Sequence, residues 1–138
     1  FLVKLDTNGT NPEMLKKLIS GNLLDYIASD FKAPLEKYEE VVSAPVDVEK
    51  ISQSVKIIME SGLPYEFRTT LVPELLDKED IKKMGEYIQG ADRWYLQKFQ
   101  PAQELVDENF TKSQPYTDKQ MQEIKDIASA YVKECGVR

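Results

Sequence analysis

Each of four short apolar segments in this chain ends in polar side chains beside a residue that turns the chain. In the second, an apolar run that begins at Leu23 ends in Asp30-Phe31-Lys32-Ala33-Pro34. Proline has no N–H group and disfavours helical geometry in the residue before it, so a strand must stop there. Side chains two residues apart on a strand share a face, so Asp30 and Lys32 are expected to point to one side. Alone, this stretch is equally typical of a solvated loop closed by a surface ion pair.

Helical segments alternate with these strands. Strands are predicted over residues 2–5, from residue 23 to the turn at 30–34, over 65–72 and over 93–99. Helices are predicted to begin at capping residues, which are Asn11 with Pro12, Asp47, Asp77 and the pair Thr117 and Gln120. Residues 35–42 are predicted to form a further short helix. In the third strand, Phe67, Thr69 and Leu71 are expected to face one way and Arg68, Thr70 and Val72 the other.

The order β-α-β-α-β-α-β-α predicts an α/β fold with a parallel sheet and right-handed crossovers. Either an open doubly wound sheet or an arc of a barrel would fit this order. In both, ligands bind at the carboxyl ends of the strands. Polar residues follow every predicted strand there: Asp6 and Thr7, Asp30 and Lys32, Arg68 and Thr70, Gln97 and Gln100. No GxGxxG segment follows the first strand, which argues against a dinucleotide-binding site.

Composition narrows the classes of function. The 138 residues are predicted to form a single domain, 1–138, with a net charge of −6 and dispersed basic residues. These features argue against nucleic acid or an anionic membrane surface as a partner. No apolar stretch approaches the ~20 residues of a membrane-spanning helix. With one cysteine and no histidine, neither a disulfide framework nor a self-contained metal site nor a Ser-His nucleophile is expected. A reducing, cytoplasmic setting is predicted.

The strand ends also suggest what kind of ligand would bind. Asp6 and Asp30 end adjacent predicted strands, about 5 Å apart at the backbone. Two carboxylates at so short a distance raise each other's pKa unless a cation compensates. Lys32 and Arg68 are available as compensating cations. Acidic side chains suit an ammonium group, and basic side chains suit a carboxylate. Together they predict a zwitterionic, amino-acid-like ligand. The alternative is a water-filled ion-pair network at the sheet edge. None of these residues is an obvious nucleophile or general base, so no catalytic residue is predicted.

The strand-end motifs resemble those of radical S-adenosylmethionine activating enzymes of glycyl-radical proteins. The matching segments occur in the family's order and spacing along nearly the whole chain: Leu5-Asp6-Thr7-Asn8-Gly9, Ser29-Asp30-Phe31-Lys32, Phe67-Arg68-Thr69-Thr70-Leu71-Val72-Pro73 and Tyr95-Leu96-Gln97-Lys98-Phe99-Gln100-Pro101. The chain is similar to the C-terminal part of a pyruvate formate-lyase activating enzyme or of an anaerobic ribonucleoside-triphosphate reductase activating protein.

This resemblance implies a fold, a cofactor and a set of ligand-binding residues. The fold would be the C-terminal half of a partial (β/α)6 TIM-like barrel, which binds S-adenosylmethionine across its strand ends. Asp6, Thr7 and Asp30 would lie around the amino and carboxylate end of the methionine, with Asn8 in the same turn. Lys32 would meet the carboxylate, Arg68 would lie near the ligand, and Gln100 would lie near the ribose or adenine. Some relatives have a histidine in place of Gln100.

The same resemblance implies an activity and partners for a parent protein. The parent would form a 5′-deoxyadenosyl radical and abstract a hydrogen from a glycine of a glycyl-radical enzyme of the formate-lyase or anaerobic ribonucleotide reductase type. An electron donor such as flavodoxin or ferredoxin would supply the electron.

The family's CxxxCxxC motif, which holds a 4Fe–4S cluster, is absent here. Cys135, expected near the end of the last helix, is interpreted as incidental. The chain is therefore interpreted as a fragment that is inactive alone. The alternative hypothesis is a non-catalytic half-barrel that oligomerises through its open sheet edges. A small α/β hydrolase is disfavoured, because there is no histidine and no nucleophile elbow.

Overall fold

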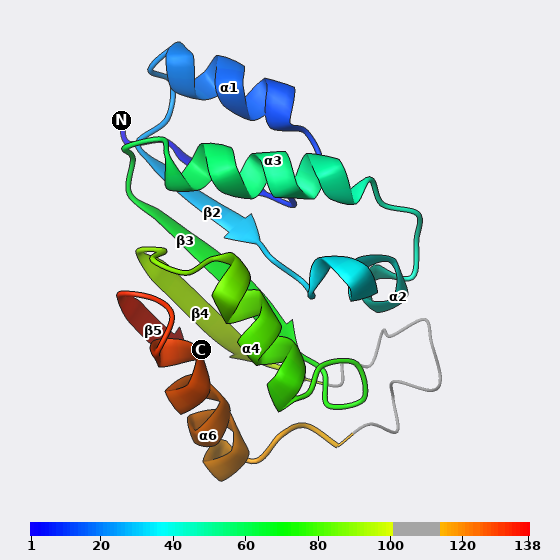
Figure 1. Ribbon diagram of the computed structural model, residues 1–138. Coiled ribbons are helices and arrows are strands. Elements are labelled where there is room, and N and C mark those ends of the chain that lie inside the picture. The colour runs from blue at the N-terminus through cyan, green and yellow to red at the C-terminus, as the bar shows by residue number, and fades with distance from the viewer. Residues whose placement is uncertain (101–113) are drawn as a thin grey trace.

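The computed structural model describes residues 1–100 and 114–138, and its strands form one parallel sheet (Figure 1). The elements in chain order are β1 (Lys4–Thr7), α1 (Pro12–Ser20), β2 (Tyr26–Asp30), the 3₁₀ turn η1 (Leu35–Lys37), α2 (Tyr38–Val42), α3 (Val48–Met59), β3 (Tyr65–Leu71), α4 (Lys78–Tyr87), β4 (Arg93–Lys98), α6 (Asp118–Ser129) and β5 (Glu134–Val137). The predicted α/β class, with helices alternating with parallel strands, is confirmed.

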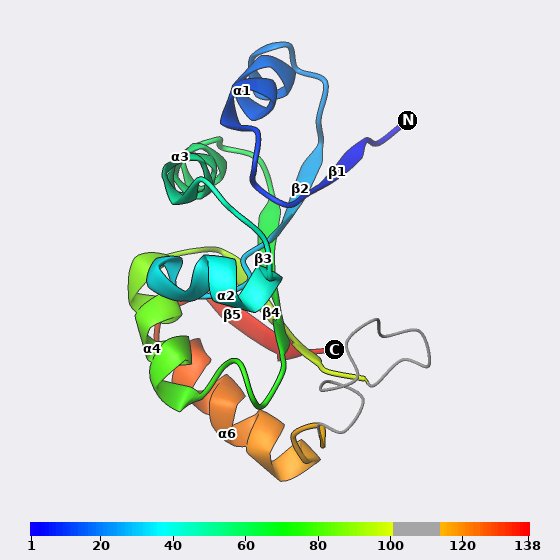
Figure 2. The same cartoon turned by 90° about the vertical axis from the view of Figure 1, so that its right-hand side faces the viewer.

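The helices lie on one face of the sheet. The strand order is β1-β2-β3-β4-β5, so each strand pairs with the next one along the chain. Right-handed crossovers that always advance in the same direction put every helix on the same side. Figure 2 shows α1, α2, α3, α4 and α6 on one side of the sheet and none of the labelled helices on the other. A doubly wound fold has helices on both faces of its sheet. Helices on one face only are the arrangement of an arc of a barrel.

The hydrophobic core lies between the sheet and these helices. Phe67, Thr69 and Leu71 of β3 point into it and are at most 1% exposed, whereas Arg68 is half-buried and Thr70 is exposed. The predicted alternation along this strand is therefore confirmed. Apolar stripes of the helices close the core from the other side, among them Ile51 and Ile58 of α3, Ile81 and Met84 of α4, and Met121 and Ile124 of α6.

The predicted helix starts are also confirmed. The side chain of Asn11 accepts a hydrogen bond from Met14 N at 3.1 Å. Thr117 and Gln120 form the expected capping box at the start of α6. Asp77 forms a second capping box, with Asp80. Each cap joins groups within one helical turn, so it needs no tertiary contact to form.

Three details of the first and last strands differ from the prediction. The first strand comprises Lys4–Thr7 rather than residues 2–5, so Asp6 and Thr7 belong to the strand. The short strand β5 was not predicted, because Glu134-Cys135-Gly136-Val137 is only four residues long and contains a glycine, and the strand forms by pairing with β4. Cys135 consequently lies in a strand opposite Trp94, not near the end of a helix.

No helix in the described part of the chain is long and apolar enough to cross a membrane.

Candidate functional site

The sheet face that carries no helices is lined by polar side chains. Strand register brings them into rows, because Asp30 pairs with Arg68, Arg68 pairs with Tyr95, and Thr70 pairs with Gln97. Asp6 belongs to the same face, since its register partner Ala28 lies two residues before Asp30. The covered face of the same strands is mainly apolar, with Ser29 and Thr69 as buried polar residues. The strand periodicity therefore separates a core from a polar surface.

Arg68 joins the two acids at the carboxyl ends of β1 and β2. Its Nη1 atom lies 3.2 Å from Asp6 Oδ1, and its Nη2 atom lies 3.3 Å from Asp30 Oδ1. The sequence placed the two acids side by side, but Asp6 pairs with Ala28 in the strand register and not with Asp30. A guanidinium therefore lies between the two carboxylates and forms an ion pair with each.

A pocket of about 290 Å³ opens beside this ion-pair cluster. Its polar lining comes from Asp30, Lys32, Arg68, Thr70 and Gln97, and its apolar wall comes from Val41, Val72 and Leu75. The hydroxyl of Thr70 donates to Gln97 Oε1 at 3.2 Å. The predicted convergence of Asp30, Lys32 and Arg68 is thus present in the structure. Their role in binding a ligand stays a prediction.

The electrostatics of the pocket suit a ligand that carries both charges. The pocket lining itself carries one acid, Asp30, and two bases, Lys32 and Arg68, while the second acid, Asp6, pairs with Arg68 from outside the pocket. Within residues 1–100 and 114–138, Lys32 Nζ forms no salt bridge, and Lys32 is exposed. Arg68 Nε is buried and lacks a hydrogen-bond partner in that same part of the chain. An unpaired buried donor costs about 1–3 kcal/mol.

Four residues predicted for the cofactor site do not line this pocket: Asp6, Thr7, Asn8 and Gln100. Thr7 Oγ1 accepts from Gly9 N at 3.1 Å, and Asn8 Oδ1 accepts from Thr10 N at 3.1 Å. Both therefore stabilise the β1–α1 turn and line a separate hollow of about 260 Å³ together with Asp6. Gln100 is exposed and does not contribute to the strand-end pocket. Gln97 contributes instead, because it shares a strand face with Tyr95. Pro101, the last residue of that motif, lies outside the described residues.

A second polar layer lies below the pocket, toward the middle of the strands. Glu66 is 3% exposed, and it accepts a hydrogen bond from Tyr26 OH at 3.0 Å. Arg138 Nη1 lies 3.1 Å from the other carboxylate oxygen of Glu66, and the Arg138 guanidinium lies 3.8 Å from the centre of the Tyr95 ring. Glu66 is not among the residues that the sequence indicated. Its spacing of two residues from Arg68, on the same strand face, was the available signal.

This second layer predicts a loss of stability at high pH. Burial, followed by the hydrogen bond to Glu66 and its negative charge, raises the pKa of Tyr26 to about 12. The unfolded chain releases this proton near the ordinary pKa of 10.0, so the stabilisation is complete below that pH and is lost as the pH rises toward 12. Urea unfolding between these pH values should show a falling free energy of unfolding. We expect a shallower fall in Tyr26→Phe, and an equal slope would contradict the assignment.

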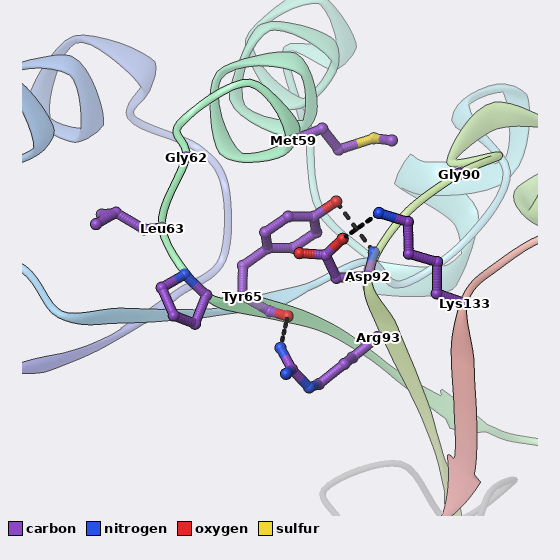
Figure 3. A pocket seen from close by; sticks show the side chains of 9 residues that line it. Met59, Gly62, Leu63, Tyr65, Gly90, Asp92, Arg93 and Lys133 are labelled. Carbon is purple, nitrogen blue, oxygen red and sulfur yellow. Dashed lines mark hydrogen bonds and ion pairs between the residues drawn. The ribbon is translucent and has the colours of Figure 1, made fainter.

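Another pocket, of about 400 Å³, lies at the opposite edge of the sheet, where β3 and β4 begin (Figure 3). Its polar groups are already paired. Lys133 Nζ lies 3.2 Å from Asp92 Oδ1. Tyr65 accepts two hydrogen bonds: its hydroxyl accepts from Asp92 N at 3.1 Å, and its backbone carbonyl accepts from Arg93 Nη1 at 3.4 Å. These contacts join the starts of the two strands. This pocket is therefore charged like the strand-end pocket but contains none of the strand-end motifs.

Comparison with known proteins agrees with the resemblance in the motifs. No family model matches the chain. A protein of Methanocaldococcus jannaschii named "Putative glycyl-radical enzyme activating enzyme" is 34% identical over 142 residues. The match covers 100% of this chain and 59% of that relative, so the chain spans about three fifths of its length. The predicted similarity to glycyl-radical enzyme activating enzymes is confirmed.

A solved structure has the same fold. It is a domain of a pyruvate-formate lyase-activating enzyme from Bacteroides vulgatus, with a TM-score of 0.75 and 16% sequence identity. The superposition covers 100% of this chain and 81% of that domain. At this identity the likeness concerns the fold, and it agrees with the barrel arc described above.

Proposed function

We propose that this chain is the ligand-binding part of a radical S-adenosylmethionine activating enzyme, and that its strand-end pocket binds the amino-acid end of S-adenosylmethionine. The observation that carries the proposal is the pocket at the carboxyl ends of β2 and β3, where the carboxylate of Asp30 lies beside the cationic side chains of Lys32 and Arg68. These residues belong to the motifs that the chain shares with activating enzymes. The similarity to the M. jannaschii protein supports the same assignment.

Each group in the pocket has a chemical part in this proposal. Lys32 binds the carboxylate of the ligand, since its ammonium group has three donors and no partner among the described residues. Asp30 binds the ligand's ammonium group through the carboxylate oxygen that Arg68 leaves free. Arg68 is held by two carboxylates, so it is preorganised before the ligand arrives. Thr70 and Gln97 offer a hydroxyl and an amide to the rest of the molecule.

The residues of this chain do not fit a 4Fe–4S cluster. The sequence has one cysteine, and the described residues contain no group of three or more His, Cys, Asp or Glu side chains that could hold a metal ion. The ligands of the cluster would therefore come from outside this chain, and the part of the relative that the chain does not span could supply them. This chain would contribute binding and positioning. The partner would be a glycyl-radical enzyme, and a flavodoxin or ferredoxin would supply electrons to the cytoplasmic parent.

Titration of the chain with S-adenosylmethionine, followed by amide chemical shifts, tests the pocket. We expect weak binding, with shifts concentrated at Asp30 to Lys32, Arg68, Thr70 and Gln97. Lys32→Ala should weaken binding roughly 10-fold or more, because a hydrogen bond to a charged group contributes about 1.5–3 kcal/mol. The matched control is Lys133→Ala at the opposite edge of the sheet, which should bind like the unmodified chain. Shifts concentrated around Lys133, or equal affinity in Lys32→Ala, would contradict the proposal.

A second candidate function is the half-barrel interaction module. It is favoured by the edge strand β1, which pairs with β2 alone among the strands of the described residues. An open edge of this kind is a template for pairing with another chain. The module hypothesis requires an oligomer in solution, and light scattering that finds a monomer at all concentrations would count against it.

A further inference from the structure

A buried relay of hydrogen bonds ends at the turn that carries Asp30 and Lys32. Trp94 Nε1 donates to Thr69 Oγ1 at 2.9 Å, and the Thr69 hydroxyl donates to the carbonyl oxygen of Phe31. All three residues are at most 1% exposed. They lie on the covered face of the sheet, opposite the strand-end pocket. The relay therefore reaches the pocket only through the backbone of Phe31.

The direction of this relay is set by chemistry. An indole N–H can only donate, so the Thr69 oxygen accepts from Trp94 and its single proton is directed to Phe31 O. No other orientation of the hydroxyl satisfies the buried carbonyl. Replacing Thr69 by an isosteric apolar residue would leave both the indole N–H and the carbonyl unpaired in the core.

The backbone groups on either side of that carbonyl are also held. Phe31 N donates to Arg68 O at 2.9 Å. Lys32 N donates to the hydroxyl of Tyr38, which is 2% exposed, at 3.2 Å. The turn between the two charged side chains thus has fixed partners on β3 and α2. Since Asp30 and Lys32 flank Phe31 directly, rotation of this one peptide group would move both charges.

We propose that Thr69 and Trp94 are positioning residues that hold Asp30 and Lys32 in the geometry that binds the ligand, an inference that rests on the proposed function. Neither residue touches the pocket. They act through the carbonyl of Phe31, and they allow the charged side chains to project from a turn that is already ordered. A preorganised turn binds more tightly, because less ordering is needed when the ligand arrives.

Two substitutions at one position test the relay. Thr69→Val keeps the shape of the side chain and removes the hydroxyl, whereas Thr69→Ser keeps the hydroxyl. Amide hydrogen exchange at Phe31 and Lys32 should become about 10-fold faster in Thr69→Val than in the unmodified chain, and Thr69→Ser should restore the slow rate. The affinity for S-adenosylmethionine should fall about 10-fold in Thr69→Val and recover in Thr69→Ser. Trp94→Phe should resemble Thr69→Val.

A stability control separates positioning from general loosening. Ile124→Ala in α6 lowers stability at a site remote from the turn. It should therefore leave the affinity for S-adenosylmethionine unchanged, and amide exchange at Lys32 should change no more than in the rest of the sheet. Unchanged exchange in Thr69→Val, or faster exchange with unchanged affinity, would overturn the proposal. If the unmodified chain binds no S-adenosylmethionine, the proposed function is overturned. Faster amide exchange in Thr69→Val would in that case still support the role of the relay in holding the turn.

Discussion

Replacement of Asp80 by alanine should destabilise the chain by about 3 kcal/mol, the cost of breaking a buried ion pair. The Asp80 side chain is 6% exposed, and its Oδ2 atom lies 2.8 Å from Lys37 Nζ. The same oxygen accepts from Asp77 N at 3.0 Å, where it completes the capping box of α4. The substitution removes both contacts and leaves the Lys37 ammonium, which is 29% exposed, without its acid. Urea unfolding would measure the loss.

The same carboxylate predicts a response to acid. Burial by itself raises the pKa of Asp80, but hydrogen bonds from Lys37 and from the Asp77 backbone outweigh it, so the pKa is lowered. Its contribution to stability is present above the ordinary pKa of 3.8 and is lost as the pH falls through the lower value of the folded state. Glu79→Ala is the matched control, because Glu79 is exposed and its ion pair among the described residues is with Lys82, three positions away in α4. A comparable loss in that variant would mean that the Lys37–Asp80 pair is not the cause.

Replacement of Phe67 by alanine should cost about 3–5 kcal/mol, the range for emptying a buried aromatic site. Phe67 is 0% exposed at the centre of β3. Its ring lies 6.1 Å from that of Phe31 and 5.6 Å from that of Tyr65, measured between ring centres. The variant therefore leaves a cavity between the sheet and the helices, directly below the strand-end turn.

Phe1→Ala provides the comparison for this variant. Phe1 is fully exposed, so its removal should change the free energy of unfolding by less than about 0.5 kcal/mol. Denaturant unfolding of the two variants should give the same slope and different midpoints. A small loss in Phe67→Ala would indicate that the core around β3 closes over the missing ring.

The features that the sequence predicted correctly depend on short-range geometry. Asn11, Asp77 and Thr117 each cap a helix by a hydrogen bond to a residue within one turn. The alternation along β3 follows from the two-residue period of a strand, which separates Phe67 from Arg68 wherever the strand lies. The approximate place of the candidate pocket follows from the same period and from the rule that ligands meet parallel strands at their carboxyl ends.

Other features depend on partners that are distant in sequence. The register of β1 against β2 decides that a guanidinium separates Asp6 from Asp30, and no local pattern specifies that register. The strand β5 forms only because β4 offers it an edge. Likewise, Gln97 lines the pocket and Gln100 does not, because β4 ends at Lys98, between the two residues.

The sequence by itself determined the alternating elements, their caps and the polar character of the strand ends, because these depend on interactions between near neighbours. Tertiary structure alone decided which polar residues meet. Arg138 reaches Glu66 across 72 positions of sequence, and Arg68 reaches Asp30 across 38. Such pairs form only when the strands have already assembled in one order and one register.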